Sequence, residues 1–342
     1  MTQQIPAAIF LLFGLGLIGA ATAEPQDNTG TGGKGANTKR GFVWAAILPH
    51  GPDILIEVTR NPALMAETRH AMEEAGRRFA AARVDTVILI DPLLSHTQNS
   101  FEKKLLFKGE GTLPVGVAAR AGGSMGGVKE SFECDLTLAQ MILDAGRAAG
   151  FPVTSDAGED GVLPLVGGGL IPLWFTIRPL PAPRPKLVVI PPSPGVSRKA
   201  LMRFGELLAE VASKSGKRVA IIASADQAHT HDPNHKRFGF SPAAAEFDAF
   251  YCKAIRENHL ERLLDVTEKT LIDSWADSPW QTLVLAGALN AVPMQADLIS
   301  YTAPSYYGMV VAVYEPTPMT LPQNRPVFRY LRGPNRAPAD RP

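Results

Sequence analysis

The segment FVWAAILPHG (residues 42–51) decides the fold class of this chain. Seven apolar residues follow one another without a polar face, as in a strand that helices cover on both sides of a sheet. The run then stops at Pro49, His50 and Gly51. A second apolar run, RVAIIAS (218–224), is likewise followed by polar residues, ADQAHTHDPNH (225–235). Ligands of open α/β sheets collect beyond the carboxyl ends of the strands, so both segments are expected at a functional edge.

Strand and helix patterns alternate outward from these two segments. Further strands are predicted at 86–90, 186–190, 298–303 and 309–315, and helices at 61–84, 135–150, 199–216, 242–266 and 280–292. This alternation predicts an α/β fold: a single three-layer α/β/α domain with a largely parallel or mixed central sheet. We expect that domain over residues 41–320, with a C-terminal tail at 321–342. The glycine-rich stretch ARAGGSMGGVKESF (119–132) is expected to be a mobile lid.

The charge and cysteine content of the chain disfavour some classes of partner and of cross-link. The 342 residues carry a formal net charge of +1 and no block of Lys and Arg, which disfavours a nucleic-acid partner. The two cysteines, Cys134 and Cys252, lie far apart and have no zinc-type spacing. We therefore expect buried free thiols rather than a disulfide framework.

The N-terminus resembles an export signal. The apolar run IFLLFGLGLIG (9–19) is too short to span a bilayer, and ATA (21–23) fits a cleavage site. We interpret residues 1–23 as a signal peptide and 24–40 as a flexible linker, which favours a periplasmic or exported protein without a membrane span in the mature domain. No basic residue precedes the apolar run, so an over-long gene start ahead of a cytoplasmic domain is the alternative.

Histidines are concentrated after the predicted strands. His70 and His259 fall in predicted helices and have surface or capping roles, whereas the other five histidines follow strands. Two imidazoles and one carboxylate, with coordination positions left open, form the ligand set of non-haem Fe(II) oxygenases. Zinc hydrolases use similar ligands, and a solvated His-rich loop needs no metal, so the residue types leave these alternatives open.

Several motifs in order resemble a known family. FVWAAILPHGPDIL, FECDLTLAQMI, GLIPLWF, VAIIASADQAHTHD, GFSPAAAEFDAF, WQTLVLAGAL and SYYGMVVAVYEP resemble class III extradiol ring-cleavage dioxygenases, over roughly residues 41–316. The most similar type is the superfamily of the protocatechuate 4,5-dioxygenase β-subunit, which includes the Memo proteins. The resemblance implies a single Fe(II), a small aromatic substrate and O₂ as partners, and a role in aromatic catabolism. It also implies a homodimer or a small partner subunit.

The resemblance assigns roles to individual residues. It implies His50 and Asp277 as metal ligands, with Asp273 as the alternative carboxylate. His229 would be the catalytic histidine, which takes a proton from a substrate hydroxyl, aided by Asp226. A helix-entry residue such as Asp277 also has an ordinary explanation in capping and the helix dipole.

Two departures from the family pattern put activity in question. Leu93 stands where the second histidine ligand is expected, and His96, three residues later, is the replacement we predict. In VGGG (166–169), glycines stand where relatives carry bulkier residues, which we expect to loosen the substrate cavity. The alternatives to an Fe(II)-dependent dioxygenase are therefore a Memo-like binding protein without catalysis and a zinc-dependent hydrolase.

Overall fold

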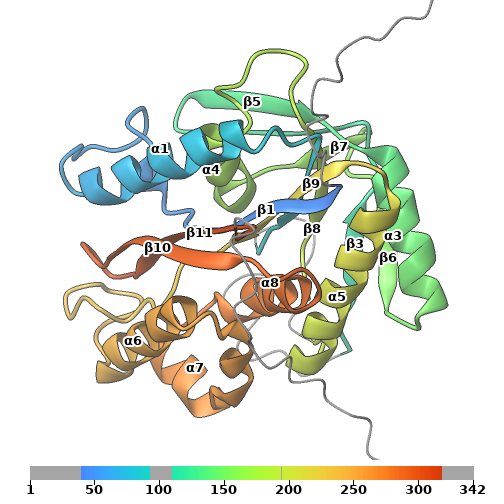
Figure 1. Cartoon of the computed structure of the whole chain (residues 1–342). Helices are drawn as coiled ribbons and strands as arrows, with labels where there is room; N and C mark the ends of the chain where they lie inside the picture. Colours follow the sequence, from blue (N-terminus) through green and yellow to red (C-terminus); the bar gives the residue numbers. More distant parts are fainter. Residues whose placement is uncertain (1–39, 93–109, 194, 318–342) are drawn as a thin grey trace, which may run out of the picture. The chain divides into compact units, whose positions relative to one another are not determined.

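A computed structural model describes residues 40–92, 110–193 and 195–317 of the chain (Figure 1). All of these residues fall in one compact unit. The expected signal peptide, the linker up to residue 39, the C-terminal tail, Leu93 and His96 lie outside the described residues. No helix in the described ranges is long and apolar enough to cross a membrane.

A mixed sheet forms the centre of this unit. Within the described part of the chain, six strands are paired in the order β10-β11-β1-β9-β2-β8. The parallel strands are β1 (Gly41–Leu48), β9 (Arg218–Ser224), β2 (Thr86–Ile90) and β8 (Lys186–Ile190). At one edge, β11 (Met309–Glu315) pairs antiparallel with both β1 and β10 (Gln295–Thr302). The α/β fold with a mixed central sheet is therefore confirmed.

Helices cover both faces of the sheet (Figure 1). On one face lie α1 (Ala66–Ala81) and α4 (Gly167–Phe175); the other carries α5 (Arg198–Lys214) and α8 (Pro279–Ala291). Successive residues of a strand point to opposite faces. In β9, Val219 and Ile221 pack in the cluster with α5, whereas Ala220 and Ile222 pack in the cluster with α1. Fully apolar strands thus bury both faces, which explains the three layers.

Smaller elements complete the unit. A two-stranded sheet joins β3 (Leu113–Gly116) to β6 (Val153–Asp156), next to α3 (Leu136–Ala148). The glycine-rich stretch is a hairpin of β4 (Arg120–Met125) and β5 (Val128–Glu133), extended by β7 (Val162–Pro164), and its mobility as a lid stays a prediction. Gly126 and Gly127 have φ of 55° and 93°, the positive values that a two-residue hairpin turn requires.

The predicted helix 242–266 is divided in the structure. Helix α6 (Pro242–Arg256) ends near Asn258, whose φ of 59° is left-handed, and a 3-10 segment η2 (Leu260–Asp265) follows. The chain continues into α7 (Glu268–Ser274), and another 3-10 segment, η1 (Pro52–Ile54), follows β1. Cys134 and Cys252 are buried free cysteines, as expected.

Candidate active site

Two loops at the same edge of the sheet bring His50 and Asp226 together. Strands β1 and β9 are parallel neighbours, with Leu48 paired to Ser224, so the residues after each strand emerge side by side. The backbone N–H of His50 donates a hydrogen bond of 2.8 Å to Asp226 Oδ1. The Nε2 of His50 lies 3.5 Å from Asp226 Oδ2, and both side chains are buried. The predicted edge location of these two residues is therefore found in the structure.

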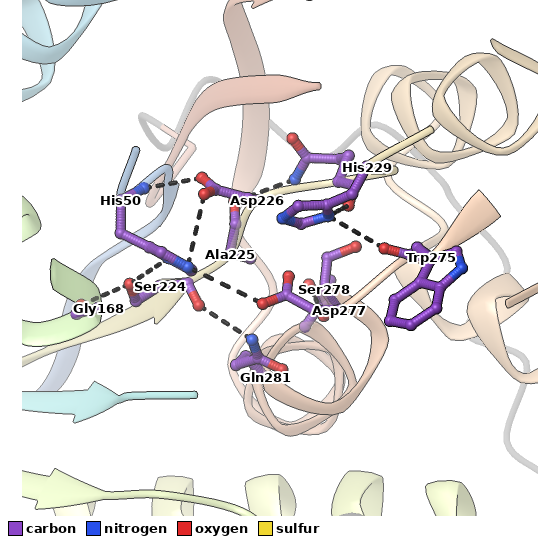
Figure 2. Close-up of polar contacts among 12 residues, drawn as sticks. His50, Gly168, Ser224, Ala225, Asp226, His229, Trp275, Asp277, Ser278 and Gln281 are labelled. Atoms are coloured by element: carbon purple, nitrogen blue, oxygen red, sulfur yellow. Dashed lines mark hydrogen bonds and ion pairs between the residues drawn. The ribbon is translucent and has the colours of Figure 1, made fainter. Parts of the chain in front are cut away.

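A relay of hydrogen bonds fixes which nitrogen of His50 faces the carboxylates (Figure 2). The Ser224 hydroxyl donates to the carbonyl of Gly168 at 2.5 Å, so its single proton is used there. The same oxygen lies 3.0 Å from His50 Nδ1 and must accept from it. Nδ1 therefore carries a proton, and Nε2 is the atom presented to Asp226 and Asp277. Metal-binding histidines are usually held by such a second hydrogen bond.

Asp277 reaches the same point from another direction. It lies between α7 and α8, and the N-cap of α8 is Ser278 rather than Asp277. The Asp277 Oδ2 atom is 3.8 Å from His50 Nε2, and the side chain is 3% exposed. The carboxylate is thus directed at His50 (Figure 2), and capping does not explain its position. Asp273, the alternative carboxylate, instead pairs with Lys269 on α7.

The two buried carboxylates, Asp226 and Asp277, repel each other when both are ionised. Burial raises the pKa of Asp226 well above its usual value, and the neighbouring Asp277 raises it further, against the lowering effect of the His50 and Gly51 backbone N–H groups. A cation beside both carboxylates would relieve this repulsion. The separations of 3.5 and 3.8 Å exceed hydrogen-bond length. They suit atoms that share one first-row cation, whose bonds to N and O are about 2.0–2.2 Å.

The described residues include part of the predicted metal site. Across residues 40–92, 110–193 and 195–317, no three His, Cys, Asp or Glu side chains already form a metal-binding group. Two of the three predicted ligands, His50 and Asp277, are brought together, and the third, His96, lies outside the described residues. The donor set of one imidazole nitrogen and carboxylate oxygens suits a divalent first-row cation, with Fe(II) and Zn²⁺ both among the ions it fits.

His229 is held beside this group with one nitrogen committed to the backbone. Its Nδ1 lies 3.0 Å from the carbonyls of Gln227 and Trp275, which only accept, so Nδ1 carries the proton and Nε2 the lone pair (Figure 2). Burial lowers the pKa of His229 to about 4, outweighing the two carbonyls that raise it. The lowered pKa favours the neutral ring at pH 7.

The carbonyl of Trp275 reaches His229 because Trp275 adopts a left-handed conformation, with φ 49° and ψ 47°, where α7 ends. Few non-glycine residues adopt this conformation, which costs about 1–2 kcal/mol. No sequence signal marks a tryptophan for it, so the sequence did not reveal this contact.

Aromatic rings surround His229. Its ring centroid lies 5.5 Å from Phe238, 5.9 Å from Tyr306 and 5.8 Å from Tyr307, and the Tyr307 ring is stacked at 22°. His235 stacks on Tyr306 at 4.0 Å. The five rings, His229, His235, Phe238, Tyr306 and Tyr307, pack against one another and form an aromatic cluster.

Asp248 anchors the loop that carries Asp226 and His229. This fully buried carboxylate accepts hydrogen bonds from the Ala228 backbone N–H at 2.9 Å and the Tyr301 hydroxyl at 2.7 Å, and lies 2.8 Å from His231 Nε2. His231 therefore belongs to this anchor. Asp248 lies within a predicted helix and carried no sequence signal of this role.

The glycines of the VGGG segment are packed rather than surrounded by space. A β-carbon at Gly167 would lie 3.4 Å from the His50 carbonyl oxygen and 3.0 Å from Met125, and one at Gly169 would lie 2.8 Å from Asp91 Oδ2. The loosened cavity we expected at this segment is therefore not found. These glycines let α4 approach His50. Gly168 also supplies the carbonyl that accepts from Ser224 in the relay. Neither Gly168 nor Ser224 was identified from the sequence as part of the site.

Comparisons with known proteins agree with this fold. Residues 44–312 match the family described as the catalytic LigB subunit of aromatic ring-opening dioxygenase. A crystal structure of an uncharacterized protein from Escherichia coli K12 is similar over 79% of this chain and 99% of its own, with a TM-score of 0.53 and 16% identity, which supports the fold alone. A search of the curated proteins finds no match.

The edge site and the aromatic cluster define a class of α/β proteins with a buried histidine–carboxylate centre beside a group of aromatic rings. Within that class, the chain belongs to the LigB family of the class III extradiol dioxygenase superfamily.

Proposed function

We propose that this protein is an Fe(II)-dependent extradiol-type dioxygenase that opens a catechol-like aromatic ring with O₂. The observation that carries the proposal is the orientation of His50, whose Nε2 faces two buried carboxylates while Nδ1 is fixed by Ser224. The aromatic cluster around His229 supports an aromatic substrate.

His50, Asp277 and His96 would hold the iron in this proposal. When bound, Fe(II) supplies neighbouring coordination positions at which a catechol and O₂ come together. The relay from His50 through Ser224 to Gly168 keeps the imidazole oriented, so that the ligand nitrogen is in place before metal binds.

His229 would handle the substrate proton. Because its Nδ1–H is bonded to backbone carbonyls, its Nε2 carries the lone pair that would accept a proton from a substrate hydroxyl. The lowered pKa keeps the ring neutral at pH 7, which is the form that accepts a proton. Asp226 would assist by holding the His50 backbone in place and by sharing its negative charge with the iron.

The alternative of a metal-free binding protein rests on the same atoms. A protonated His50 would form ion pairs with Asp226 and Asp277 at 3.5 and 3.8 Å without any metal. These contacts are longer than charge-assisted hydrogen bonds, which are about 2.7–2.9 Å, and this favours the metal.

Anaerobic metal analysis of the full chain, followed by addition of catechol and air, tests the proposal. We expect near-stoichiometric iron, O₂ uptake and a yellow ring-opened product. His50→Ala should abolish iron binding, and His229→Ala should keep iron but lose turnover. Asp277→Asn should weaken iron binding, with Asp273→Asn as the matched control that leaves it unchanged. A folded protein that binds no iron would favour the binding-protein alternative, and bound zinc with hydrolytic activity would favour a hydrolase.

A further inference from the structure

The hydroxyl of Tyr307 is a buried polar group that the proposed roles leave unused. Tyr307 is 2% exposed, and its hydroxyl has no hydrogen-bond partner in the described part of the chain. Two other tyrosine hydroxyls are bonded, Tyr251 to Thr282 at 2.6 Å and the half-buried Tyr301 to Asp248 at 2.7 Å, whereas the hydroxyl of the buried Tyr314 also has no partner in the described residues. Leaving a buried hydroxyl without a partner costs about 1–3 kcal/mol, so such a group in a ligand site calls for an explanation.

The Tyr307 hydroxyl lies against the turn that carries His50. A β-carbon built on Gly51 would be 2.3 Å from this oxygen, so the hydroxyl rests directly on the Gly51 backbone. The glycine in the His50–Gly51 pair is therefore needed for this contact. The Tyr307 ring stacks on His229, with centroids 5.8 Å apart. One phenol thus touches both the iron-binding turn and the proton-handling histidine.

The hydroxyl remains protonated in this position. Burial raises the pKa of Tyr307 above its ordinary value, and the Asp226 carboxylate raises it further. A neutral phenol has one proton to donate. Its most favourable acceptor would be a negatively charged oxygen, because hydrogen bonds to ionised groups are roughly twice as strong as those between neutral groups.

We propose that the Tyr307 hydroxyl donates a hydrogen bond to a deprotonated hydroxyl oxygen of the aromatic substrate. The ligand class is then an aromatic ring with an ionised hydroxyl placed between the His50 turn and His229. This inference rests on the proposed function, because the substrate oxygen is one that the iron site and His229 also address. Tyr307 thereby selects catecholate-like ligands.

Anaerobic titration with 4-nitrocatechol tests the proposal, since its visible absorption reports binding. The iron-loaded full chain is compared with Tyr307→Phe and Tyr314→Phe. Tyr314 is a matched control: it is also buried with a hydroxyl that has no partner in the described residues, and it lies five residues beyond Met309, roughly 16 Å along β11. We expect the Kd to rise about tenfold or more in Tyr307→Phe, the loss of a hydrogen bond to a charged group, and to stay within about twofold in Tyr314→Phe.

The outcomes separate this inference from the function on which it rests. If the wild type binds neither iron nor 4-nitrocatechol, the proposed function and the role of Tyr307 both fail. If the wild type binds both and Tyr307→Phe has an unchanged Kd at full iron content, only the role of Tyr307 is overturned. An equal loss in both tyrosine variants, or loss of iron in Tyr307→Phe, also overturns it, because the hydroxyl would then serve the structure rather than the ligand.

Discussion

Replacing His229 by Gln should change how the stability of the protein depends on pH. Burial lowers the folded-state pKa of His229 to about 4, whereas the unfolded value is about 6.5. Between these two values the unfolded state binds the proton and the folded state does not, so the stabilising contribution of the neutral ring is lost as pH falls. The difference of roughly 2.5 pKa units corresponds to about 3 kcal/mol, most of which is lost between about pH 7 and pH 4.5.

The contribution of Asp226 to the free energy of unfolding depends on pH with the opposite sign. Its folded-state pKa is raised, so the folded state binds more protons above the ordinary carboxyl pKa, and stability from this group falls as pH rises. The wild-type curve alone therefore mixes two effects. The difference between wild type and His229→Gln isolates His229, because glutamine does not titrate and its amide N–H can still donate to the carbonyls of Gln227 and Trp275.

Urea unfolding of both proteins with a chelator present, at several values between about pH 4.5 and pH 7, measures this difference. We expect the wild type to lose about 2–3 kcal/mol more than the variant over this interval. A difference that stays flat within about 0.5 kcal/mol would show that His229 is not held neutral in the folded protein. The argument for its lone pair as proton acceptor would then be refuted.

Three further changes test other parts of the site. Ser224→Ala removes the acceptor of His50 Nδ1–H and should weaken iron binding by about 10–100-fold in a competition titration, with the exposed Ser213→Ala as the unchanged control. Gly51→Ala places a β-carbon 2.3 Å from the Tyr307 hydroxyl and should lower the free energy of unfolding by about 1–3 kcal/mol; a loss below about 0.5 kcal/mol would contradict the contact. Asp248→Ala deprives its three polar partners of their acceptor and should destabilise by about 3–5 kcal/mol in urea unfolding, whereas near-wild-type stability would show that it does not anchor the loop.

The strands of the central sheet were predictable because a short, fully apolar run is most stable as a strand buried on both faces of a sheet. Residues 86–90 and 186–190 were predicted with the bounds that the structure shows. The helices α1, α3, α5 and α8 were also predicted, with ends that differ by a few residues. The β4–β5 hairpin was missed because glycine-rich sequence favours both tight turns and loose loops, and only the positive φ values at 126 and 127 distinguish them.

The candidate site was predictable only where a side chain follows a strand or a family motif. His50, Asp226 and His229 were found for this reason, and the structure places them at one edge. The residues that hold these side chains in place were not predictable. Ser224, which contacts His50, has no feature in the sequence that distinguishes it from other strand residues. Gly168 acts through its backbone carbonyl. Every residue has such a carbonyl, so the sequence does not indicate which one accepts a hydrogen bond. Tyr307 escaped notice because burial of its hydroxyl depends on packing against Gly51, which no local pattern reveals.

The location of bound iron tests the central claim most directly, through a crystal structure of the full chain loaded anaerobically with Fe(II). The account predicts one iron ion bonded to His50 Nε2, to an Asp277 oxygen and to the imidazole of His96. Iron bound elsewhere, or an iron-free His50 clamped between Asp226 and Asp277 with His96 directed away, would contradict it.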